Sequence, residues 1–144
     1  MSSSTPPVSS KPKRPDKVFR HRHRLHGRAD FAAVHRAKMR KHAGPLSMLA
    51  RPNDRPESRL GMTVSRKVGP AVTRNRIKRL LREAFRLERH DWTPGFDLLV
   101  IVRPHTPLAL AEYRRLLTQA MLALESEWQR RARRQEKREE GAGS

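Results

Sequence analysis

Six cationic side chains fall within thirteen consecutive positions near the middle of the chain, and their spacing suits phosphate binding. They are Arg74, Arg76, Lys78, Arg79, Arg82 and Arg86. On a helix with 3.6 residues per turn these side chains share one arc, while the apolar side chains share an opposite arc of about 160°. Such a helix can bury its apolar side and present a cationic ridge, the six residues named above, to a polyanion.

The position of these charges within the helix also indicates an anionic partner. Four of them lie in the first turns, where the helix dipole is positive and each added cation destabilises by about 0.3–1 kcal/mol. A phosphate bound there would offset that cost. The alternative is a solvated charged face, but such faces usually carry interleaved glutamates for i,i+4 pairs, and only Glu83 precedes Glu88 here.

The composition of the chain favours the same class of partner. Its 144 residues include 33 Lys and Arg against 14 Asp and Glu, a net charge of +19, which points to nucleic acid or, less often, to an anionic membrane surface. No apolar run approaches the roughly 18 residues of a membrane-spanning helix, and the first residues lack the apolar core of a signal peptide. We therefore expect a cytoplasmic protein with no membrane partner.

The sequence gives little sign of protein-based catalysis. It has no cysteine, its acidic residues are scattered, and it carries no Asp-x-Asp, His-Glu-x-x-His or phosphate-binding Gly-x-x-x-x-Gly-Lys pattern. We expect no catalytic residue and no metal held by the protein. Asp97, inside an apolar strand, is expected to be a structural hydrogen-bond acceptor. His21, His23 and His26 could suggest a metal site, but in a basic segment they are better interpreted as phosphate contacts.

The hydrophobic pattern predicts a small α+β domain with elements in the order α-β-β-α-β-α. The expected helices are 26–40, 71–89 and 107–130, and the expected strands are 46–50, 59–67 and 96–103. The first two strands are expected to pair as an antiparallel hairpin with one wet face. The third is apolar on both faces and therefore belongs inside a sheet covered by helices. Residues 59–103 would form a βαβ unit in a mostly antiparallel sheet.

Both ends of the chain are expected to lie outside this domain. Residues 1–22 are rich in Ser, Pro, Lys and Arg and predict a flexible basic arm. Residues 130–144 predict a charged tail that is frayed or disordered. The folded domain, which the charge suggests binds nucleic acid, is thus expected to span residues 23–129.

The run from Val64 to Arg86, VSRKVGPAVTRNRIKRLLREAFR, closely resembles the signature of the bacterial ribonuclease P protein subunit. A looser likeness extends to Ala29–Phe31 and Asp97–Arg103. The resemblance implies that an RNA subunit, with Mg²⁺ at its active site, cleaves precursor tRNA to release the 5′ leader. It also implies one protein per RNA and a left-handed βαβ crossover, against the usual right-handed preference.

The resemblance assigns two groups of residues. Those expected to bind the catalytic RNA are Arg66, Lys67, Arg74, Asn75, Arg76, Lys78, Arg79, Arg82 and Arg86. Those expected to line a cleft for the leader are Phe31, His35, Thr63, Ser65 and Lys67. From the residues alone, Phe31 has two interpretations, a core side chain or a platform on which an unpaired base stacks.

Two other functions remain open at this point. A ribosomal or general RNA-binding protein with no part in processing would have a similar charge. A DNA-compacting protein is the third hypothesis, disfavoured because nothing in the sequence suggests dimeric half-sites.

Overall fold

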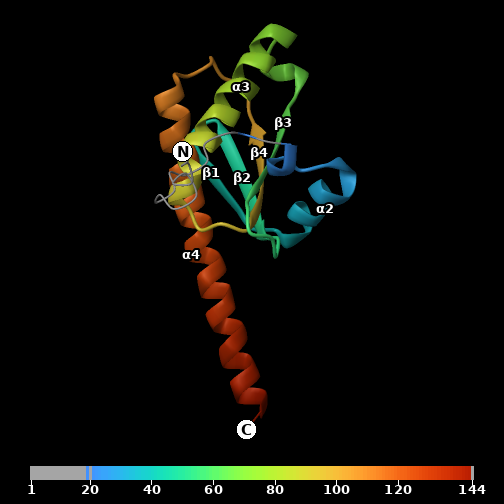
Figure 1. Cartoon of the computed structure of the whole chain (residues 1–144), viewed down its shortest axis with the longest axis vertical. Coiled ribbons are helices and arrows are strands. Elements are labelled where there is room, and N and C mark those ends of the chain that lie inside the picture. Colours follow the sequence, from blue (N-terminus) through green and yellow to red (C-terminus); the bar gives the residue numbers. More distant parts are fainter. Residues whose placement is uncertain (1–18, 20, 144) are drawn as a thin grey trace, which may run out of the picture.

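The computed structural model describes residue 19 and residues 21–143, which form a four-stranded sheet with helices on both faces (Figure 1). None of the described helices is both long and apolar enough to cross a membrane. The predicted α+β class is confirmed, with one strand more than expected. The elements are η1 (His21–His23), α2 (Gly27–Ala37), β1 (Arg40–Ala43), β2 (Leu46–Pro52), β3 (Arg59–Val64), η2 (Arg66–Val68), α3 (Ala71–Glu88), η3 (Arg89–Asp91), β4 (Phe96–Val102) and α4 (Leu110–Gly143).

The strands lie in the order β1-β2-β4-β3, so the last strand of the sequence is interior to the sheet. β4 pairs antiparallel with β2 and parallel with β3, and all of its residues except Ile101 are buried. The predicted interior strand and the βαβ unit formed by β3, α3 and β4 are therefore confirmed. The predicted hairpin between segments 46–50 and 59–67, which correspond to β2 and β3, was wrong, because β4 lies between them.

The additional strand, β1, begins at Arg40, the last residue of the segment that was predicted to be helical. Helix α2 stops at Ala37 because Lys38 adopts a left-handed conformation with φ of 54°. The chain then runs through β1, turns at Gly44, where φ is 55°, and returns as β2. As an edge strand of mostly polar residues, β1 lacks the apolar alternation from which strands are recognised.

Helices α3 and α4 cover one face of the sheet and α2 covers part of the other (Figure 1). α3 buries four side chains against the sheet and α4, and all four lie in the apolar arc expected from its periodicity: Ile77, Leu81, Ala84 and Phe85. On the opposite face Val34 of α2 packs with Leu49 and Leu99. The cationic side of α3 is therefore held in place by the buried, packed side of the same helix.

Asp97 is the centre of a buried polar network that joins three strands. Its side chain is fully buried and accepts hydrogen bonds from Arg59 Nε and Nη2, both at 2.8 Å, from Asn53 at 2.9 Å and from Arg51 at 3.2 Å. Burial raises the pKa of Asp97, but the hydrogen bonds from Arg59 and Asn53 outweigh it, so the pKa lies below its ordinary value. The structural role expected for Asp97 is confirmed.

The C-terminal segment differs most from expectation. α4 begins at Leu110 and continues as a helix to Gly143, so the prediction of a frayed or disordered segment was wrong. Arg, Lys, Glu, Gln and Ala, which dominate this segment, are strong helix formers. Trp128 fixes the helix to the sheet, since its indole Nε1 donates to the carbonyl oxygen of Ala50 at 2.9 Å. Beyond that point α4 projects from the domain as a single rod (Figure 1).

The expected N-terminal arm falls mostly outside the described residues, which lack positions 1–18 and 20. Phe19 packs edge-on against Phe85 at a centroid distance of 5.8 Å. His23 is fully buried and its Nε2 lies 2.8 Å from Glu57 Oε2, so the expected phosphate contact by His23 was wrong. Burial raises the pKa of Glu57, but hydrogen bonds from His23 and Arg22 outweigh it and lower the pKa to about 2.

Candidate nucleic-acid interface

Five of the six charges on the cationic ridge of α3 form no ion pair within the described part of the chain. Arg86 forms an ion pair with Glu83 on the same helix. The other five members form no ion pair with any described carboxylate; they are Arg74, Arg76, Lys78, Arg79 and Arg82. Asn75, which lies between Arg74 and Arg76 in the sequence, is exposed. Because the ridge is held by a buried helix face, it can bind an anion without first being ordered.

The cationic surface continues into the segment before α3. Arg66 and Lys67 lie in η2 and are exposed. Arg74 reaches back from the first turn of α3, and its Nε donates to the carbonyl oxygen of Gly69 at 3.0 Å. This hydrogen bond joins the segment between η2 and α3 to the first turn of the helix.

A pocket of about 160 Å³ opens between α2, β3 and α3. It brings Phe31, from the expected leader cleft, to the same opening as Lys78 and Arg82 from the ridge. The two surfaces that were predicted separately are therefore continuous at the edge of β3. The residues that line the pocket are Phe19, Arg24, Leu25, Phe31, Leu60, Gly61, Met62, Lys78 and Arg82.

The pocket combines an apolar floor with a cationic rim. The guanidinium of Arg24 lies 5.4 Å from the centroid of the Phe19 ring. Burial, and after it the charge of nearby Arg24, lowers the pKa of Arg82. Aromatic rings and cations are the groups with which proteins bind the bases and phosphates of single-stranded nucleic acid.

Sequence reasoning missed part of this pocket and included residues that do not line it. Phe19 and Arg24 were placed in or next to the flexible arm, although Phe19 is the only Phe, Trp or Tyr among the first 22 residues. His35, Thr63, Ser65 and Lys67 are exposed and do not line the pocket; they lie farther along α2, β3 and η2. Phe31 is half-buried and packs beside Leu25, so it serves the core and the pocket together.

The face of β3 that was predicted to be exposed to solvent is covered at Gly61 by Leu25 and Phe31. A Cβ added at Gly61 would lie 2.8 Å from Leu25 Cδ1 and 3.0 Å from Phe31 Cζ. Thr63 and Ser65 are exposed, as expected. Glycine at this position therefore allows Phe31 to approach the strand and form the pocket floor.

We expect Gly61→Ala to destabilise the protein by about 1–3 kcal/mol, the usual cost of overpacking. Urea unfolding followed by circular dichroism measures the change. Gly141→Ala is the matched control, since an added Cβ at that position meets no atom within 4 Å. Equal unfolding midpoints for Gly61→Ala and the unmodified protein would show that Phe31 and Leu25 are not held against β3.

The described residues contain no group of three or more His, Asp or Glu side chains arranged to hold a metal ion. His23, His26 and their neighbours therefore do not form a three-ligand site among the described residues. The interface consists instead of cations, aromatic rings and small polar side chains, which are groups that bind nucleic acid.

Comparison with known proteins agrees with this chemistry. A family model described as "Ribonuclease P" matches residues 19–126, three quarters of the chain. The chain belongs to the ribonuclease P protein family. Curated ribonuclease P protein components from Desulfovibrio desulfuricans and Ruegeria pomeroyi are similar: the first is 36% identical over 100 residues (68% of this chain, 77% of the relative), the second 48% over 84 residues (56% and 66%).

Solved ribonuclease P proteins share the fold. The protein from Thermotoga maritima superposes with a TM-score of 0.61 at 33% identity, covering 67% of this chain and 92% of that one. The protein from Staphylococcus aureus gives 0.62 at 27% identity, covering 70% and 94%. The match to the ribonuclease P family ends at residue 126, so the outer part of α4 lies beyond it.

Proposed function

We propose that this protein is the RNA-binding subunit of ribonuclease P and assists the 5′ maturation of precursor tRNA. The observation that carries the proposal is the row of uncompensated cations on α3, which is joined to the Phe31 pocket in a chain of this family. A rigid cationic surface beside an aromatic floor fits one structured RNA and one unpaired strand.

The two parts of the surface have different partners in this proposal. The catalytic RNA contacts Arg66, Lys67, Arg74, Asn75, Arg76, Lys78, Arg79, Arg82 and Arg86. The 5′ leader lies along Phe31, His35, Thr63, Ser65 and Lys67, and it enters the pocket beside Arg24. Because His35 and Leu49 stand where the family often has further aromatic residues, electrostatic contacts contribute more of the leader affinity here.

The protein supplies binding, and the RNA supplies the chemistry. Mg²⁺ at the RNA active site supports cleavage, and no protein side chain contacts the reacting phosphate. Cations placed on the RNA reduce the repulsion between the catalytic RNA and its substrate, so the complex needs less magnesium to assemble. One protein bound to each RNA, in the cytoplasm, is sufficient for this role.

Reconstitution tests the function. Adding the protein to a bacterial ribonuclease P RNA at low magnesium is expected to restore leader cleavage of precursor tRNA, measured by gel electrophoresis of a 5′-labelled substrate. The protein without RNA is expected to be inactive. RNA binding without stimulation of cleavage would favour a general RNA-binding protein, and cleavage by the protein alone would reject the proposal.

A further inference from the structure

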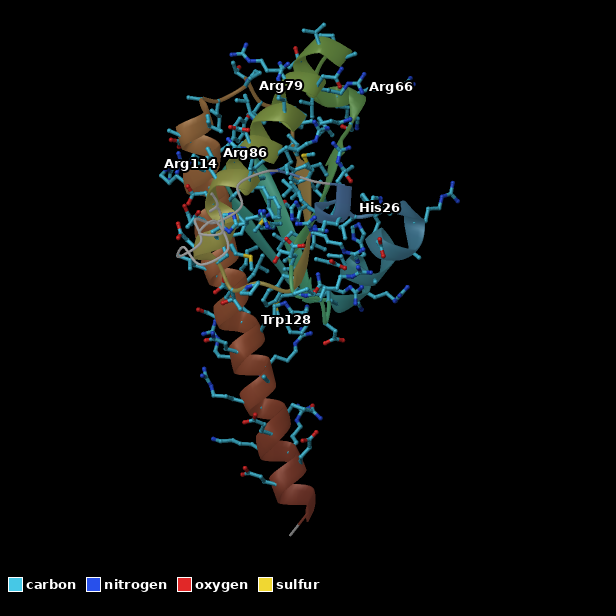
Figure 2. The ribbon with its side chains drawn as sticks, viewed as in Figure 1. His26, Arg66, Arg79, Arg86, Arg114 and Trp128 are labelled. Carbon is cyan, nitrogen blue, oxygen red and sulfur yellow. The ribbon has the colours of Figure 1, made fainter. Side chains whose placement is uncertain are left out.

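The outer part of α4 carries a second row of cations that the α3 interface does not include. Residues 129–141 are all exposed, and the helix that bears them projects beyond the sheet (Figure 2). At 1.5 Å per residue, residues 129–143 span about 22 Å. Six cations lie within one arc of about 160° and are called the tail ridge below: Arg130, Arg131, Arg133, Arg134, Lys137 and Arg138.

The acidic residues of this segment do not neutralise the tail ridge. Glu136, Glu139 and Glu140 lie outside that arc, with Glu139 opposite to it and Glu140 next to its edge. Arg134 and Arg138 have no acidic residue three or four positions away in either direction, and they form no ion pair with any described residue. They are also four positions apart, where like charges repel each other. A helix stabilised by its own ion pairs would alternate the two signs.

The segment is anchored so that the tail ridge has a fixed direction. Arg131 lies with its guanidinium carbon 4.6 Å from the centroid of the Trp128 ring, and its Nη1 donates to the carbonyl oxygen of Ala37 at 3.4 Å. Trp128 is itself bonded to Ala50 of β2. These contacts tie the base of the extension to α2 and the sheet, so the outer turns extend from a rigid support.

The side chains of the segment favour RNA over a membrane as the partner. An interfacial membrane helix needs an apolar face that enters the lipid. Between residues 129 and 141 the only apolar side chain is that of Ala132. A helix with one cationic face and no apolar face is suited to the regular phosphates of a nucleic-acid backbone.

We propose that the tail ridge is a second RNA-binding surface, which contacts backbone phosphates of the same RNA that binds α3. This inference rests on the proposed function. Figure 2 places Arg79 and Arg66 at one end of the molecule and the extension beyond Trp128 at the other. An RNA that meets both surfaces spans the protein, and the α3 contact raises the local concentration of phosphates near the tail ridge.

Two variants of the full chain test this surface without removing the helix. The neutralised variant carries Arg134→Gln and Arg138→Gln. The relocated variant carries Arg134→Glu with Glu136→Arg, and Arg138→Glu with Glu140→Arg. It keeps the composition and the net charge and changes the number of like-charge i,i+4 pairs only from four to three, but moves two cations out of the tail ridge. Circular dichroism verifies that both variants keep their helical content.

Binding to a bacterial ribonuclease P RNA transcript is measured across a series of monovalent salt concentrations. If both arginines contact phosphates, each variant has a slope of log K against log salt that is shallower by about two units. If the variant and the unmodified protein bind equally at 1 M salt, this change in slope makes the binding of the variant at 0.15 M salt about 30-fold weaker. An unchanged slope in both variants would overturn the proposal. The proposal would also be overturned if the relocated variant bound the RNA as tightly as the unmodified protein while the neutralised variant bound more weakly.

Two parallel measurements separate the possible failures. An α3 variant, Arg76→Gln with Arg79→Gln, is titrated beside the tail variants. If it loses affinity while the tail variants do not, this inference fails and the proposed function stands; if the unmodified protein does not bind the transcript, the proposed function fails. Anionic vesicles containing phosphatidylserine are the second probe, and binding to them that depends on Arg134 and Arg138, without a change in RNA binding, would assign the surface to a membrane.

Discussion

Replacing Asp97 with alanine is expected to destabilise the protein by about 3–5 kcal/mol. The substitution removes four hydrogen-bond contacts and leaves Arg59, whose side chain is 7% exposed, as a buried cation without its main partner. Asp30 also reaches Arg59, but at 3.3 Å and from a more exposed position. Such a loss is a large fraction of the stability of a domain of this size.

Urea unfolding at neutral pH measures this effect. Asp91→Ala is the control, because Asp91 is exposed and forms no ion pair with described residues; its change is expected to stay within about 0.5 kcal/mol. The lowered pKa of Asp97 adds a pH dependence: its contribution is present above the ordinary aspartate pKa of about 3.9 and is lost as the pH falls through the folded-state value. An unchanged unfolding midpoint in Asp97→Ala would contradict this account.

The second large effect is expected on RNA affinity, from Arg76→Gln combined with Arg79→Gln. Both side chains are exposed and form no ion pair with described residues, whereas Arg74 also holds Gly69 and is less suitable. Removing two phosphate contacts is expected to make the salt slope shallower by about two units and to weaken binding at 0.15 M salt by tenfold or more.

The matched control removes the same charge from another helix. Arg114→Gln with Arg115→Gln also subtracts two cations, but these arginines are paired with Glu88 and Glu112. Filter binding to a ribonuclease P RNA transcript is expected to show little change in the control. Equal losses in the two double variants would mean that net charge, rather than the α3 surface, determines affinity.

The elements with a clear hydrophobic repeat, α3 and β4, were predicted from the sequence alone. The 3.6-residue repeat identified the buried side of α3, including Ile77 and Leu81, and the unbroken apolar run identified β4 as an interior strand. Asp97 was interpreted correctly because an isolated acid in such a strand requires partners. These inferences need no knowledge of how distant segments meet.

The incorrect predictions concern long-range pairing or weak local signals. Alternation showed that two segments are strands, but it did not show that β4 separates them, since strand order depends on contacts across about 40 residues. β1 carries too few apolar residues to be recognised. The charged end of α4 was interpreted by its hydrophilicity, although its residues favour helix. The pocket required Phe19 and Arg24 to return beside β3, which no sequence pattern indicated.

The interior position of β4 also bears on how the protein is made. The hairpin of β1 and β2 and the strand β3 are not neighbours in the sheet, and each is joined to the other only through β4. During synthesis, therefore, the sheet cannot close until β4, which ends at residue 102, has emerged from the ribosome. Until then β2 and β3 each lack the strand with which they pair, so the core between the sheet and α3 cannot be completed before nearly three quarters of the chain has been made.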